Sequence, residues 1–106
     1  MKTEDLIAKY EALLQQRPDD ELLHFSLGKA LYDAGRLPEA ENHLLTALEA
    51  KPDWMVVTML LAKIALQRDD TTGARLLYQK GLKLAIAQDH EGPEAEIRAA
   101  LEKLDA

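Results

Sequence analysis

The sequence predicts an all-α fold, a superhelical solenoid built from antiparallel helix pairs. Apolar residues recur at intervals of three and four through most of the 106-residue chain, as the buried face of a helix requires. Segments rich in turn-forming and helix-breaking residues, such as 34–38 and 89–93, divide this pattern into about six helices. Several residues also recur with a period of 34, a length typical of stacked helical hairpins.

Capping and breaking residues set the order and the expected bounds of the helices. We expect helices at about 3–16, 20–33, 38–50, 53–67, 72–88 and 93–104. Thr3 is expected to cap the first helix, and Pro38 suits the first turn of the third. The acidic pairs at 19–20 and 69–70 stand at helix starts, where carboxylates accept bonds from free amides, so we interpret them as caps.

The period of 34 residues is carried by positions whose types suit packed helices. Six such pairs are Pro18 and Pro52, Leu27 and Leu61, Gly28 and Ala62, Ala40 and Ala74, Leu44 and Tyr78, and Ala47 and Gly81. Large apolar residues can fill the seam between two antiparallel helices, and small ones let two backbones approach. The chain is therefore interpreted as a repeat.

This pattern resembles the tetratricopeptide repeat, whose consensus is W-x2-L-G-x2-Y, then A-x3-F, then P, at 34 residues. The first copy has His24, Leu27, Gly28, Leu31, Ala40, Leu44 and Pro52 at these places. The second has Thr58, Leu61, Ala62, Ala65, Ala74, Tyr78 and Ile86. His24 and Thr58 replace the usual aromatic residue, which thins the packing there. Ile86 replaces the proline, so the helix that contains it is expected to run on past its usual stop.

The resemblance implies a single domain over residues 1–106, of the kind found in small bacterial repeat proteins. It divides the chain into a leading half repeat (3–18), a first repeat (21–54), a second repeat (55–88) and a capping helix (93–104). The last helix has an apolar row and a polar outer side, as the end of a solenoid needs. The apolar row consists of Ile97, Ala100, Leu101 and Leu104.

Gly28 lies inside a helical pattern, where glycine costs about 1 kcal/mol relative to alanine. We interpret it as the point where the first helix of a pair approaches the second near Ala40. Because Ala62 occupies the matching place in the second repeat, the substitution Gly28→Ala is expected to be nearly neutral or stabilising.

Composition excludes several classes of function. The 13 Lys and Arg residues against 19 Asp and Glu give a formal charge of -6, so nucleic acid is not an expected partner. The absence of cysteine excludes disulfides and thiol chemistry and suits a cytoplasmic location. The apolar stretch 54–62 is too short to span a bilayer, and the charged amino terminus does not resemble a signal peptide. No membrane association and no export are expected.

The sequence offers little for catalysis. It has one serine, Ser26, and three histidines, His24, His43 and His90, and no two histidines are spaced as paired ligands on one helix face. No phosphate-binding glycine loop is present. We therefore predict no enzyme activity, no catalytic residue, no cofactor and no metal site.

The resemblance implies that partners bind on the concave face, which the first helix of each pair lines. The residues expected there are Leu22, Phe25, Lys29, Tyr32, Val56, Met59, Lys63 and Leu66, with Arg98 continuing the row on the capping helix. This strip combines apolar anchors with cations, which favours a helix or extended peptide of a partner protein that carries acidic groups. The protein is thus expected to be a non-catalytic interaction scaffold.

Two other interpretations stay open. The same apolar strip can be the core of a short closed array, with its lysines solvated. The helix around residues 54–66 is apolar on several faces, so a homodimer or larger self-assembly is the alternative function. The Lys/Asn clamp by which some relatives bind chaperone tails is not recognisable, because Phe25 and Lys29 take the places of its first lysine and its asparagine.

Overall fold

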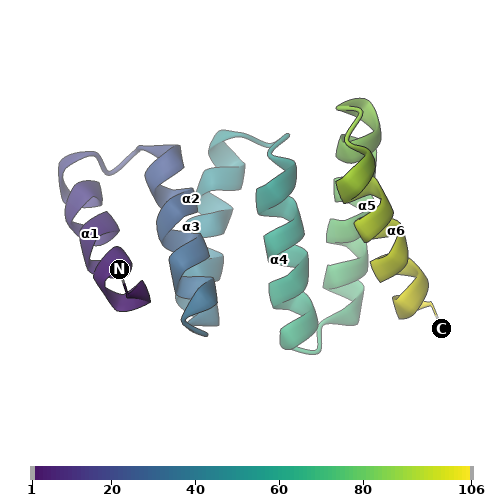
Figure 1. Ribbon diagram of the computed structural model, residues 1–106, viewed down its shortest axis with the longest axis horizontal. Coiled ribbons are helices and arrows are strands. Elements are labelled where there is room, and N and C mark those ends of the chain that lie inside the picture. Colours follow the sequence, from purple (N-terminus) through teal and green to yellow (C-terminus); the bar gives the residue numbers. More distant parts are fainter. Residues whose placement is uncertain (1, 106) are drawn as a thin grey trace. The chain divides into compact units, whose positions relative to one another are not determined.

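The computed structural model of the protein describes residues 2–105, which form six α-helices and no strand (Figure 1). The predicted all-α fold and number of helices are confirmed over this range. The chain divides into two compact units, the first ending at Pro52 and the second beginning at Asp53. Within each unit, successive helices run in opposite directions (Figure 1).

The first unit contains α1 (Thr3–Gln16), α2 (Glu21–Asp33) and α3 (Leu37–Ala50). Helix α2 packs against both α1 and α3. The buried apolar residues of the first unit are Ile7, Leu23, Leu27, Ala30, Leu31, Ala40, Leu44 and Ala47. Arg36, in the turn between α2 and α3, pairs with Glu39 at 2.7 Å and with Glu4 of α1 at 3.5 Å. These ion pairs connect the start of α3 to α1.

The second unit contains α4 (Met55–Gln67), α5 (Thr71–Ala87) and α6 (Glu91–Leu104). Helix α5 packs against both α4 and α6. One core cluster of the second unit consists of Met55, Met59, Ala62, Ala65, Ala74, Tyr78, Ala85 and Ile97. Thr58 is also buried, and its hydroxyl donates to the carbonyl of Trp54 at 3.1 Å, so its burial leaves no unpaired polar group.

Aspartate caps start two of the helices. Asp20 Oδ1 accepts the backbone amides of Leu22 and Leu23 at 3.0 and 3.1 Å, at the start of α2. Asp70 Oδ1 accepts the amide of Gly73 at 2.9 Å, at the start of α5. The second residue of each acidic pair therefore caps a helix, as the sequence predicts.

The expected cap is wrong for α1, and the expected start differs by two residues for α4 and for α6. Thr3 is itself the first residue of α1, and Lys2 precedes it without a side-chain cap. Since a capping residue must lie outside the helix, Thr3 cannot fill that role. Helix α6 begins at Glu91, two residues before the expected Pro93. Proline is accommodated there because amides of a first helical turn have no partner within the helix.

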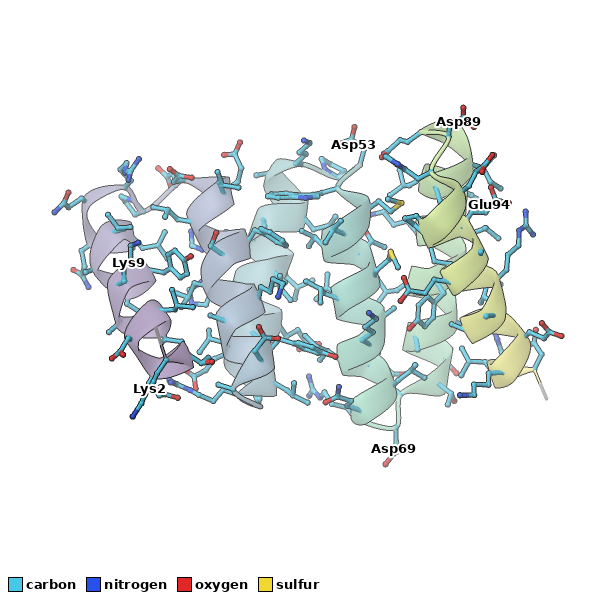
Figure 2. The ribbon with its side chains drawn as sticks, in the orientation of Figure 1. Lys2, Lys9, Asp53, Asp69, Asp89 and Glu94 are labelled. Atoms are coloured by element: carbon cyan, nitrogen blue, oxygen red, sulfur yellow. The ribbon has the colours of Figure 1, made fainter. Side chains whose placement is uncertain are left out.

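Three helices end with a residue in the left-handed backbone conformation. These residues are Gly35 after α2, Asp69 after α4 and Asp89 after α5, with φ of 78°, 60° and 59°. The amide that follows each donates to the carbonyl five residues earlier: Arg36 to Leu31, Asp70 to Ala65 and His90 to Ala85, each at 2.9 Å. Figure 2 shows Asp69 and Asp89 at these turns, with side chains pointing outward.

Gly28 lies where α2 and α3 approach closely. A Cβ atom added to Gly28 would lie 2.8 Å from Leu44 Cγ, 2.9 Å from Leu44 Cδ2 and 3.4 Å from the Ala40 carbonyl oxygen. The predicted close approach is confirmed. The structure argues against the expectation that alanine is neutral here, because the Leu44 side chain is fully buried and its branch point would have to move.

Candidate partner-binding surface

Helix α2 carries four of the predicted partner-binding residues, namely Leu22, Phe25, Lys29 and Tyr32. Their spacing of three and four places them along one side of the helix. The side chain of Leu22 is strongly exposed, with 61% of its surface accessible. Lys29 is exposed, and the rings of Phe25 and Tyr32 are half-buried. This side of α2 therefore combines exposed apolar surface with a cation.

Phe25 and Lys29 also line a hollow of about 230 Å³ beside α1. The remaining lining comes from Leu6 and Tyr10 of α1 and from Ser26, Ala30 and Asp33 of α2. The structure thus brings an apolar ring, a cation and a carboxylate to one hollow. Leu22 and Tyr32 do not line it.

Helix α4 carries Val56, Met59, Lys63 and Leu66, and these residues differ in exposure. Val56 is 45% exposed, whereas Met59 is 8% exposed and belongs to the core of the second unit. Lys63 and Leu66 are half-buried. Met59 therefore belongs to the same core cluster as Ile97, while Val56 offers apolar surface to solvent.

A larger hollow, of about 750 Å³, lies between the end of α4 and the last turns of α6. It is lined by Leu66, Ala99, Ala100, Glu102, Lys103 and Leu104. Leu66 is the only predicted binding residue among those that line this hollow; Arg98, although it lies on α6, does not line it. The sequence predicts the last helix only as a cap. Its apolar row, which contains Ala100 and Leu104, was the feature that could have indicated this hollow.

The three predicted cations of the surface all have carboxylate partners within their own unit. The pairs are Lys29 with Asp33 at 3.3 Å, Lys63 with Glu96 at 3.5 Å and Arg98 with Glu94 at 3.0 Å. Such exposed ion pairs are individually weak and are screened by salt. A partner carboxylate would therefore have to displace a carboxylate of this chain, at modest cost.

Residues 2–105 contain no group of three or more histidine and acidic side chains that could hold a metal ion. Within the same range, no helix is both long enough and apolar enough to cross a membrane.

The structure brings together two histidines that the sequence treats separately. His24 of α2 and His43 of α3 lie 19 residues apart in sequence, with their Nδ1 atoms 3.0 Å apart. Because the two helices run antiparallel and Gly28 lies against the Ala40 carbonyl, the residue one turn before Gly28 falls beside the turn after Ala40, which contains His43. That geometry, rather than spacing along one helix, was the available signal.

These features define a class, the α-helical repeat proteins with a 34-residue period. The chain belongs to the tetratricopeptide repeat family, since residues 7–64 match that family. A tetratricopeptide repeat-containing protein of Pseudomonas aeruginosa is 34% identical to this chain over 100 residues. The match covers 94% of this chain and 95% of that protein. The resemblance suggested by the repeat is confirmed.

Solved structures show the same fold. A Bordetella parapertussis protein solved in solution is 30% identical, with a TM-score of 0.83, over 94% of this chain and 87% of that one. PcrH, crystallised with the chaperone binding region of PopD, has a TM-score of 0.89 at 23% identity, over 97% of this chain and 78% of that one. The Yersinia enterocolitica type III secretion translocator chaperone SycD has a TM-score of 0.91 at 15% identity, over 97% and 72%.

Proposed function

We propose that this protein is a non-catalytic interaction module that binds a helix or an extended peptide of a partner protein. The observation that carries the proposal is the exposure of Leu22, at 61%, on the same side of α2 as Phe25 and Lys29, which line a hollow. Partner interfaces commonly combine an exposed apolar anchor with an aromatic pocket and a polar rim. This side of α2 has all three elements.

Family membership supports the proposal. In PcrH, this fold is found in complex with a segment of another protein, the chaperone binding region of PopD. Repeat proteins of this type use exposed side chains on a rigid helical frame to contact a partner, without catalytic groups.

The proposed contact residues are those expected from the sequence, assigned by exposure. Exposed or half-buried members are proposed to contact a partner within each unit: Leu22, Phe25, Lys29 and Tyr32 in the first, and Val56, Lys63, Leu66 and Arg98 in the second. Met59, which is buried, supports the α4 surface from inside the second unit. The cytoplasmic location stays a prediction.

Peptides from a random phage-displayed library, selected on the purified protein and labelled with a fluorophore, provide the probe. We expect Leu22→Glu to weaken peptide binding about tenfold or more, because it places a charge at an apolar anchor. The dissociation constant is measured by fluorescence anisotropy. A thermal melt of the same sample shows that the variant is folded.

Leu76 provides the matched control, since it is 63% exposed on α5 and is not a predicted contact. Leu76→Glu should leave the dissociation constant unchanged. Equal effects of the two substitutions, or selected peptides that bind Leu22→Glu as tightly as the parent, would contradict the proposal.

We further propose that the preferred peptides carry acidic groups that compete for the cations of the surface. Asp33→Asn removes the carboxylate that pairs with Lys29, so it should tighten binding of an acidic peptide by a few-fold at low salt. The gain should shrink at high salt, because screening weakens the new attraction. An unchanged affinity at low salt would remove the acidic preference but not the interaction itself.

The alternative function is self-association through residues 54–66. In the second unit, Met55 and Met59 are already buried in the core, which weakens the reason for expecting a second copy there. Light scattering at increasing protein concentration tests this alternative. A dimer that Val56→Glu dissociates would support it, since Val56 is exposed on this helix.

A further inference from the structure

We propose that the hydrogen-bonded pair of His24 and His43 is a proton-sensitive lock that fastens α3 and the α1–α2 turn to α2. The lock is closed while the pair holds no more than one extra proton, and it opens when both rings are charged.

The lock consists of two consecutive hydrogen bonds. The Nδ1 atoms of His24 and His43 lie 3.0 Å apart, and His24 Nε2 lies 2.8 Å from the carbonyl oxygen of Pro18. The two rings are stacked, with centroids 5.3 Å apart and planes inclined by 26°. One ring of α2 is thus bonded to α3 on one side and to the α1–α2 turn on the other.

The Pro18 carbonyl determines which nitrogen carries each proton. A carbonyl oxygen only accepts, so His24 Nε2 must carry a hydrogen. In neutral His24 the Nδ1 atom therefore has only a lone pair. His43 must then donate its Nδ1 hydrogen to His24, which leaves His43 Nε2 as an acceptor. The direction of both hydrogen bonds follows from one carbonyl group.

The lock opens when the histidine pair binds its second extra proton. The first extra proton can bind His43 Nε2, and both hydrogen bonds survive. The second must bind His24 Nδ1, which places two N–H groups opposite each other at a separation of 3.0 Å. The shared bond is then lost, and two adjacent cations repel. Double protonation is therefore incompatible with the closed pair.

Charged groups on the neighbouring helices affect the pKa of His43. Burial and, next, the proximity of His24 hold the pKa of His43 below its ordinary value, while Glu11 of α1 and Glu39 of α3 oppose this. His43 and Glu11 also line a hollow of about 420 Å³ with Gln15 and Pro18, which gives solvent protons a route to the pair. Opening is therefore expected on the acid side of neutrality.

The position of the lock suggests what it regulates. His24 lies between Leu22 and Phe25, two of the proposed partner contacts. Opening would loosen the start of α2 and so weaken partner binding in acid. This consequence rests on the proposed function, whereas the lock itself is tested below without any partner.

The test combines a histidine titration with amide hydrogen exchange on the full chain. Nitrogen-15 spectra of the imidazole rings, recorded from pH 8 to pH 4.5, should show His24 and His43 titrating in two coupled steps. His90, exposed in the second unit, provides the reference ring in the same sample. Amides of residues 22–24 and 43–47 should lose protection about fivefold or more between pH 7.5 and pH 5, relative to amides of α5, after correction for intrinsic exchange.

Substitutions at His43 separate the lock from general acid sensitivity. His43→Gln keeps an N–H donor for His24 but cannot gain a proton, so protection of these amides should persist at both pH values. His43→Leu removes the donor, so protection should be low at both. His90→Gln should behave like the parent.

Two results would overturn the proposal. One is a His43→Gln variant that loses protection in acid as much as the parent does. The other is a parent spectrum in which the two rings titrate independently and share no hydrogen bond. If His43→Gln does not fold, the parent spectrum alone decides.

Discussion

Gly28 shows how one missing methyl group positions two helices. A Cβ atom added at Gly28 would lie within 3 Å of the buried Leu44 side chain. We therefore expect Gly28→Ala to destabilise the protein by about 1 to 2 kcal/mol, although alanine has the better helix propensity. Urea unfolding followed by circular dichroism measures the change. Gly92→Ala is the control, since nothing lies within 4 Å of its added Cβ. A Gly28→Ala midpoint equal to that of the parent would contradict the close approach.

The left-handed turn residues provide a second prediction. Gly35 and Asp69 occupy the same place, 34 residues apart, but only glycine adopts this conformation without strain. Asp69→Gly should therefore stabilise the protein by up to about 1 kcal/mol, and Gly35→Ala should destabilise it by about 1 kcal/mol. Both are measured by thermal unfolding. A loss of stability in Asp69→Gly would show that the Asp69 side chain contributes more than its backbone costs.

Helix starts in this protein depend on two aspartates. Asp20→Ala and Asp70→Ala should each destabilise the protein by about 1 kcal/mol, since each leaves backbone amides of a first turn without an acceptor. Asp19→Ala is the control, because Asp19 precedes the cap and should change stability by less than about 0.5 kcal/mol. Differential scanning calorimetry compares the three. Equal losses for Asp19→Ala and Asp20→Ala would contradict the capping assignment.

The pairing of α2 with α3 should make stability depend on pH. In the folded protein the pKa of His43 is lowered, mainly by burial and next by the proximity of His24. The unfolded chain therefore binds a proton at this residue more readily. Stability should therefore be highest above the unfolded pKa of about 6.5 and should fall as pH decreases through 6.5 toward 5. Urea midpoints at pH 7.5, 6 and 5 measure the slope. His43→Gln should flatten it, and an unchanged slope would assign the dependence to other groups.

Across the chain as a unit of folding, we expect one cooperative unfolding transition. Each compact unit has only about half of the residues, and chains that short bury a small fraction of their surface and are at best marginally stable alone. Trp54 fluorescence reports on the second unit, and the ring signals of His24 and His43 report on the first. The two probes should give the same midpoint. Separate midpoints would show that the units unfold independently, and the prediction of a single domain over 1–106 would then fail.

The amino-acid sequence alone specified the helices, their order and their 34-residue period. These features depend on residues a few positions apart, such as the apolar spacing along one helix or the Asp20 cap three residues before Leu23. Two of the surface ion pairs are equally local, because Lys29–Asp33 and Arg98–Glu94 are each separated by four residues on one helix. The division into a half repeat, two repeats and a cap is read from the same signals and stays a prediction.

Tertiary structure alone decided which side chains of different helices meet. It placed His24 against His43, paired Lys63 with Glu96, buried Met59 in one core cluster with Ile97 and opened a hollow between Leu66 and α6. None of these contacts follows from spacing within one helix, because each depends on the distance and rotation between two helices. Those quantities are determined by packing, as at Gly28, where a change of one methyl group alters how closely α2 and α3 can approach.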